Sequence, residues 1–184
     1  MCNTWRHTQH CARCRTLDTS SILPNSLKTP RHKMTVKPTP QHIISYDTAR
    51  GLVAAALDAA TRAGKDVSVA VVDPSGHLVA FGRSDTAALL SINVAIDKAY
   101  TSAVSRIPTH GWQETVATDA PIRDGVPGAI PRLITVGGGQ LAYFNGQIIG
   151  AIGVSGAHWD GDRALGEEAL RSMGLFEEAP RNEV

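Results

Sequence analysis

The feature that most constrains the fold is a pair of apolar segments, QLAYF and QIIGAIGVSG, joined by Asn145-Gly146. Asn-Gly is a strong signal for a two-residue hairpin turn, because both turn positions need positive φ. VSVAVVD and HLVAFGR are joined in a similar way by Pro74-Ser75-Gly76. Strands joined by tight turns pair in antiparallel fashion, so the sequence predicts an antiparallel sheet and not a doubly wound parallel one.

Apolar spacing and capping residues predict four helices. The first follows Ser45, an N-cap residue, and stops near Gly64. The second carries apolar residues at helical spacing over residues 86–105. Thr109 is expected to cap a third, short helix (HGWQETVA), and a fourth begins near Asp160.

The remaining connection is read as a loop followed by a strand. DAPIRDGVPGAIP is rich in Pro, Gly and Asp and predicts a loop, whereas RLITV after it predicts a strand. The expected order is therefore α-β-β-α-α-β-β-β-α. This order predicts an α/β (α+β) fold in which helices flank a five-stranded antiparallel sheet.

The composition fits one globular domain. With 184 residues, 42% of them hydrophobic, the chain has room for a sizeable core. We expect the domain over residues 41–176, a disordered basic tail over residues 1–40 and a C-terminal tail over residues 177–184. No apolar run approaches a membrane span, and a net charge of +1 gives no case for nucleic acid. Without an apolar secretory-type region, a cytoplasmic location is expected.

The basic tail has its own composition. Residues 1–33 carry six Lys or Arg and one acid, and all three cysteines lie at or before Cys14. The domain is therefore expected to lack a disulfide framework and a thiol nucleophile. Cys11-Ala-Arg-Cys14 resembles half of a zinc site, but no second ligand cluster accompanies it, so no metal site is predicted. Met34 as the true start is the favoured interpretation, and a targeting segment is the alternative.

The glycine-rich stretch over residues 137–156 raises the question of a phosphate-binding loop. Such loops place glycines where a strand leads into a helix, and no helix begins directly behind Gly150 or Gly153. A nucleotide loop is therefore not expected. Glycine inside a strand costs stability and lets a backbone, a helix or a flat ligand approach closely. The sequence leaves ligand contact and subunit contact both open.

Three blocks carry a family resemblance: SINVAIDKAYTSAVSRIPTHGW, PRLITVGGG and NGQIIGAIGVSGAHWDGDRALGEEAL. Together they resemble the GlcG/HbpS-type haem-binding protein family, which includes the C-terminal domain of PduO-type cobalamin adenosyltransferases. The resemblance covers roughly residues 43–173. It implies a profilin-like fold assembled as a homo-oligomer, either a dimer or larger. Some members bind haem, and others are linked to small-molecule catabolism, so the fold alone does not fix the function.

A haem site needs an axial donor, a flat apolar slot and cations for the propionates. His110 and His158 are the candidate donors, since each follows a core element and lies beside tryptophan. Tyr100 in DKAYTSA is a third candidate, although core packing is the favoured interpretation for this residue. Trp112 and Trp159 fit either a pocket rim or a subunit interface. The absence of C-x-x-C-H excludes covalent attachment.

The alternative is a cofactor-independent enzyme, a hydrolase, isomerase or lyase acting on a small carboxylated catabolic intermediate. Lys98 and Arg132 could neutralise its carboxylates. His110 could act as general acid or base, oriented by Asp97 or Asp124. The simpler interpretation makes Lys98 and Arg132 ordinary surface charges. The first hypothesis is therefore a soluble, oligomeric protein that binds haem or another tetrapyrrole. The enzyme is the second, and a structural or sensory partner without chemistry of its own is the third.

Overall fold

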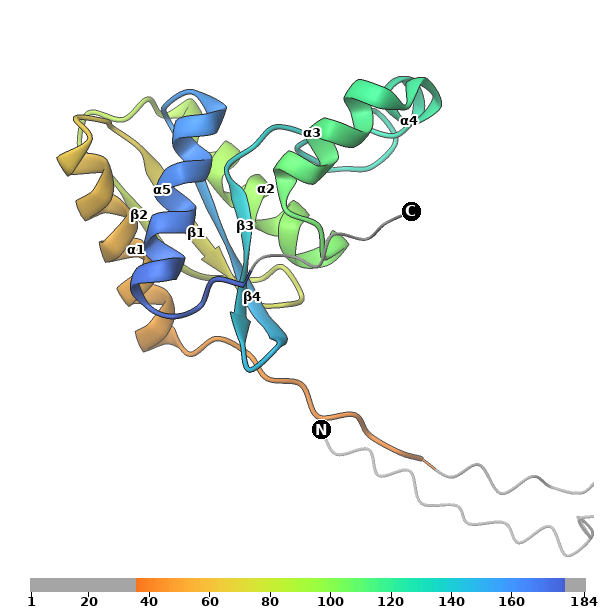
Figure 1. Ribbon diagram of the computed structural model, residues 1–184, viewed down its shortest axis with the longest axis horizontal. Helices are drawn as coiled ribbons and strands as arrows, with labels where there is room; N and C mark the ends of the chain where they lie inside the picture. Colours follow the sequence, from red (N-terminus) through yellow and green to blue (C-terminus); the bar gives the residue numbers. More distant parts are fainter. Residues whose placement is uncertain (1–35, 178–184) are drawn as a thin grey trace, which may run out of the picture. The chain divides into compact units, whose positions relative to one another are not determined.

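The computed structural model describes residues 36–177 (Figure 1). The described helices and strands all lie within one compact unit, which begins at Pro40. They follow in the order α1 (Tyr46–Arg62), β1 (Ser68–Val72), β2 (Leu78–Arg83), α2 (Leu90–Ser105), α3 (Thr109–Thr118), α4 (Ala120–Gly125), β3 (Gly139–Phe144), β4 (Gln147–Ser155) and α5 (Trp159–Ser172). Within the described residues, no helix has the length and hydropathy that a membrane span requires. The cysteines and the start-site interpretation of Met34 fall outside these residues.

The strands form one antiparallel sheet in the order β2-β1-β4-β3. Both predicted hairpins are confirmed. Asn145 and Gly146 have φ of 50° and 74°, the conformation that the turn between β3 and β4 requires. The predicted cap of α1 is also confirmed, because the Ser45 hydroxyl accepts a hydrogen bond from the Thr48 N–H at 3.2 Å.

The sheet has four strands, so the prediction of a fifth strand over residues 132–136 is wrong. Arg132 has φ of 66°, which interrupts an extended strand at its first residue. The backbone of this segment bonds to α2 instead. The Thr101 hydroxyl donates to the Arg132 carbonyl and accepts from the Ile134 N–H, both at 3.0 Å. Because one side chain satisfies both groups, the segment lies along a helix and not along a sheet edge.

Two local predictions before this segment also fail. The stretch expected to be only a loop contains α4, because the Asp119 side chain caps it by accepting from the Ile122 N–H at 3.0 Å. Thr109 does not cap α3, because Pro108 holds the N-cap position. The order of elements is therefore α-β-β-α-α-α-β-β-α.

Helices cover both faces of the sheet. On one face α1 packs on β1 and β2, and α5 packs on β3 and β4; on the other, α2 packs on β1, β3 and β4 (Figure 1). The α1 and α5 face holds the larger apolar cluster, which includes Leu52, Ile152 and Leu170. The α2 face is built largely from alanine, with Ala95 and Ala99 against the strands. Small side chains here bring the α2 backbone close to the sheet.

Gly153 shows how close this approach is. A Cβ at this position would lie 2.1 Å from the Ala95 carbonyl oxygen and 2.5 Å from the Ala99 nitrogen. The close neighbour of Gly153 is therefore α2 of the same chain, neither a ligand nor a second subunit. Gly150 is similarly crowded, since its Cβ would lie 2.4 Å from the Val72 carbonyl oxygen. These glycines serve packing within the fold.

Candidate functional site

A cavity of about 520 Å³ lies where α3, β3, α5 and the segment after α5 meet. Two positively charged guanidinium groups, three carboxylates and one imidazole share it with an amide and several apolar side chains. The lining residues are Pro108, His110, Glu114, Gln140, Leu141, Tyr143, Arg163, Glu167, Arg171, Phe176 and Glu177. Its size is that of a site for a small organic ligand or cofactor.

His110 lies in the first turn of α3, and its ring faces β3. The amide nitrogen Nε2 of Gln140 lies 3.4 Å from His110 Nδ1. Burial lowers the pKa of His110, and the positive charge of Arg163 lowers it further against the opposing charges of Glu114 and Glu167. The imidazole is therefore neutral at neutral pH, the form that coordinates metal or accepts a proton.

Glu167 joins the two arginines of α5. It accepts from Arg163 Nε at 2.7 Å and from Arg171 Nη2 at 2.8 Å, and its side chain is 13% exposed. Burial acts to raise the pKa of Glu167, but the hydrogen bonds and charges of Arg163 and Arg171 outweigh burial and lower the pKa. Within the described residues each guanidinium makes no other hydrogen bond, so both retain N–H groups for an anionic ligand.

The apolar wall comes from β3 and from the segment after α5. Phe176 lies beneath Arg171, whose guanidinium carbon is 4.0 Å from the ring centroid. Tyr143 N–H donates to the Leu175 carbonyl at 2.8 Å, which holds this segment against β3. Burial raises the pKa of Tyr143, and the charge of Glu177 adds to the effect. The Tyr143 phenol is therefore neutral at physiological pH.

Lys98, the first of the predicted charged residues, does not line the cavity. It is 3% exposed, and its ammonium donates to Asp162 Oδ2 at 2.8 Å and to the Val154 carbonyl at 3.0 Å. Burial raises the pKa of Asp162, and the ammonium of Lys98 opposes this. In this arrangement Lys98 ties α2 to β4 and α5 and presents no charge to a ligand in the cavity.

Arg132 and Tyr100 form a separate cluster beside α2. Arg132 Nε donates to Asp97 Oδ1 at 2.7 Å, and its guanidinium carbon lies 3.8 Å from the Tyr100 ring centroid. Neither residue lines the cavity. The structure therefore does not bring Lys98, His110 and Arg132 together.

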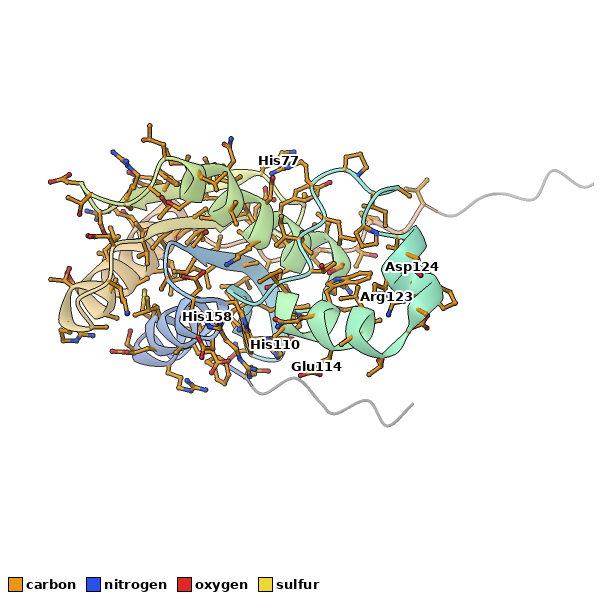
Figure 2. All side chains as sticks on the ribbon, turned by 90° about the horizontal axis from the view of Figure 1, so that it is seen from above. His77, His110, Glu114, Arg123, Asp124 and His158 are labelled. Carbon is orange, nitrogen blue, oxygen red and sulfur yellow. The ribbon has the colours of Figure 1, made fainter. Side chains whose placement is uncertain are left out.

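His158 and the other predicted residues also lie outside the cavity. His158 is exposed at the N-cap of α5, with its Nδ1 2.5 Å from Asp160 Oδ1. Asp124 pairs with Arg123 on α4, not with His110 (Figure 2). Trp112 donates from Nε1 to the Ser105 hydroxyl at 3.0 Å, as expected of a partly buried tryptophan.

The α5 residues of the cavity are absent from the candidates predicted from the sequence. Arg163, Glu167 and Arg171 stand four residues apart, a spacing that places them in one row on a helix. That signal was available, but it equally describes a row of surface ion pairs. No sequence pattern marked Gln140 as a site residue, because a single polar residue is common in a strand whose side chains alternate between the two faces.

The family comparison agrees with this architecture. The family model described as haem degrading protein HbpS-like matches residues 44–171. The chain belongs to the HbpS-like family. The resemblance seen in the sequence, which covered roughly residues 43–173, is thereby confirmed.

Individual relatives of this HbpS-like chain are similar over most of its domain. Protein GlcG of Escherichia coli K12 is 34% identical over 119 residues, which cover 61% of this chain and 81% of GlcG. The corrinoid adenosyltransferase PduO of Salmonella typhimurium is 26% identical over 139 residues, covering 76% of this chain and 41% of PduO.

Solved structures share the fold. Klebsiella pneumoniae protein ORFY superposes with a TM-score of 0.69 at 28% identity, covering 78% of this chain and 99% of ORFY. A double mutant of HbpS from Streptomyces reticuli gives a TM-score of 0.68 at 28% identity, covering 79% of this chain and 97% of that chain. The antiparallel α+β architecture is therefore that of the family.

Proposed function

We propose that this chain binds haem in the cavity beside His110. The carrying observation is that one cavity of an HbpS-like domain combines a half-buried imidazole with two guanidinium groups, each of which makes a single hydrogen bond within residues 36–177. The family description, haem degrading protein HbpS-like, supports the choice of ligand.

The donor set fits haem. His110 would supply a nitrogen ligand to the iron, and Arg163 and Arg171 would pair with the propionates. Tyr143 and Phe176 would pack against the macrocycle from the apolar wall. When bound, haem supplies a redox-active iron, whereas the residues of the chain bind it, orient it and neutralise its carboxylates.

A haemin titration with a matched histidine control tests this proposal. We expect the protein to give a Soret band on addition of haemin, and His110→Ala to lose or shift that band. His158→Ala removes an exposed histidine outside the cavity and is expected to leave the band unchanged. An unchanged spectrum in His110→Ala, with a loss in His158→Ala, would assign the iron ligand to His158 at the N-cap of α5.

A second candidate is an enzyme that acts on a small carboxylated intermediate. The same two guanidinium groups would bind its carboxylates, and His110 would act as acid or base, whereas Lys98 and Arg132 lie elsewhere. No haem-induced spectral change, together with protection of the protein against thermal unfolding by small dicarboxylates, would favour this function.

The homo-oligomer, the cytoplasmic location and the role in small-molecule catabolism stay predictions. Leu89 and Leu90 at the start of α2 are 71% and 78% exposed, which supports the expectation of a second subunit. Mass measurement with and without haemin tests the oligomer.

A further inference from the structure

Three residues that line the cavity each come directly after a buried, hydrogen-bonded residue in the chain. His110, Gln140 and Arg163 each directly follow a buried residue that is bonded to a different element of the fold. The three preceding residues are Thr109, Gly139 and Asp162. Together with Lys98 they form the anchor layer, a set of buried residues bonded to one another and adjacent in the chain to residues that line the cavity.

The first bond of the anchor layer joins α3 to β3. The Gly139 N–H donates to the Thr109 hydroxyl at 2.8 Å, and Thr109 is fully buried. A Cβ on Gly139 would lie 2.4 Å from the Lys98 carbonyl oxygen and 2.8 Å from Thr109 Cγ2. The start of β3 therefore has no room to shift relative to α2 or α3, and His110 and Gln140 follow directly on either side of the bond.

The second bond joins α2 to α5. Lys98 Nζ donates to Asp162 Oδ2 at 2.8 Å, and Asp162 Oδ1 accepts from the Ala157 N–H at 2.9 Å. The two bonds lie close together, because Gly139 makes the first bond and its neighbour Gly138 lies beside the lysine of the second. A Cβ on Gly138 would lie 2.6 Å from Lys98 Nζ. Arg163 follows Asp162, so the ion pair fixes the turn of α5 that carries Arg163, one of the two arginines of the cavity.

We propose that Thr109 and the Lys98–Asp162 pair are positioning residues for the ligand site. They hold His110, Gln140 and Arg163 in one geometry through bonds made one residue earlier in the chain. That the ligand is haem rests on the proposed function, whereas the positions of His110, Gln140 and Arg163 do not depend on it. Buried hydrogen bonds have defined lengths and directions, so they fix side-chain positions more tightly than apolar packing of the same volume.

A pair of substitutions at Thr109 tests the first bond. Thr109→Val keeps the shape and removes the acceptor of Gly139, whereas Thr109→Ser keeps the hydroxyl. The control is Ser91→Ala, which removes a different buried hydroxyl of α2, bonded to Ser68 at 2.7 Å and remote from the cavity in sequence. All three are compared by thermal unfolding, so that loss of stability is measured separately.

The decisive measurement is made on the full chain without haem. The Gln140 amide and the His110 ring are close enough for a nuclear Overhauser contact, since their nitrogens are 3.4 Å apart. We expect Thr109→Val to lose this contact and to bind haemin about tenfold more weakly. Thr109→Ser and Ser91→Ala should retain both the contact and the affinity.

A second variant tests the ion pair without leaving a buried charge unpaired. Lys98→Met combined with Asp162→Asn removes both charges and keeps an acceptor for Ala157, so folding is expected. We expect weaker haemin binding and shifted resonances for Arg163. If Thr109→Val and this double variant lose stability but keep the Gln140–His110 contact and the wild-type resonances, the anchor layer has no positioning role. If wild-type protein binds no haemin, the proposed function fails, but the Gln140–His110 contact measured without haem still tests the positioning role of the anchor layer.

Discussion

The inner and outer sides of α2 each carry an ion pair, and the two pairs lie in opposite environments. On the inner side, the Lys98 and Asp162 side chains are 4% and 3% exposed. On the outer side, the Arg132 and Asp97 side chains are 42% and 27% exposed. The bond lengths hardly differ, at 2.8 Å and 2.7 Å, so geometry alone does not distinguish them.

What distinguishes the two pairs is the cost of breaking them. Removing one partner of a buried pair leaves a charge without water or counter-ion, whereas an exposed charge is simply rehydrated. The row Arg163–Glu167–Arg171 is intermediate, because Glu167 is 13% exposed and both arginines reach solvent. Three substitutions test this gradient, and a fourth tests the packing on the inner side of α2. They follow from the largest expected effect to the smallest.

Among the four substitutions, Lys98→Met should lower the free energy of unfolding most. It leaves the Asp162 carboxylate buried without its counter-ion, and we expect a loss of about 3–5 kcal/mol in the free energy of unfolding. Urea denaturation near neutral pH measures the loss. A loss below about 1 kcal/mol would mean that Asp162 is hydrated or protonated in the variant, and the contrast between the two sides of α2 would disappear.

Gly153→Ala tests whether the inner side is limited by space as well as by charge. Its Cβ would lie 2.1 Å from the Ala95 carbonyl oxygen, so α2 must move away from the sheet. We expect a loss of about 1–3 kcal/mol by thermal or urea unfolding. Gly128→Ala is the matched control, because among the described residues no atom other than those of its chain neighbours lies within 4 Å of its Cβ position.

Glu167→Gln tests the intermediate row through its pH dependence. The lowered pKa of Glu167 in the folded state means that the carboxylate contributes stability above its unfolded value of 4.5, and that this contribution is lost as pH falls through the folded pKa. We expect the variant to be less stable than wild type near neutral pH and to converge with it in acid. Parallel curves across the acid range would show that the arginines do not stabilise the charged form.

Arg132→Ala should have the smallest effect. Its ion pair with Asp97 and its contact with Tyr100 are exposed to solvent, so we expect a loss of about 0–1 kcal/mol. Haemin affinity should not change, since Arg132 does not line the cavity. An effect on affinity alone would place a second ligand contact on the outer side of α2.

Much of the fold could be predicted because its signals are local. Asn145-Gly146 requires a turn whatever surrounds it, and Ser45 caps α1 with its own side chain. The strand expected at Arg132 failed because Thr101, 31 residues earlier, satisfies the backbone that a neighbouring strand would otherwise bond. No local pattern contains that information.

The candidate site was less predictable than the fold. His110 was identified from its position beside Trp112, and it lies in the cavity. Lys98 and Arg132 were chosen because their side chains can bind carboxylates, yet the site's cations are Arg163 and Arg171. The chemistry of a residue is visible in the sequence, whereas its burial and its partners are not.

By itself, the sequence determined the hairpins, the helix periods, the antiparallel class and the family, because each depends on residues close together in the chain or on a shared pattern. Only the tertiary structure decided that Lys98 forms a buried ion pair and that Gly153 lets the α2 backbone pack directly on β4. It also decided that His110, Gln140 and Arg163, from three different elements, line one cavity. The physical reason is that burial and long-range bonding are properties of the packed chain, since both depend on which distant segments exclude water from each other.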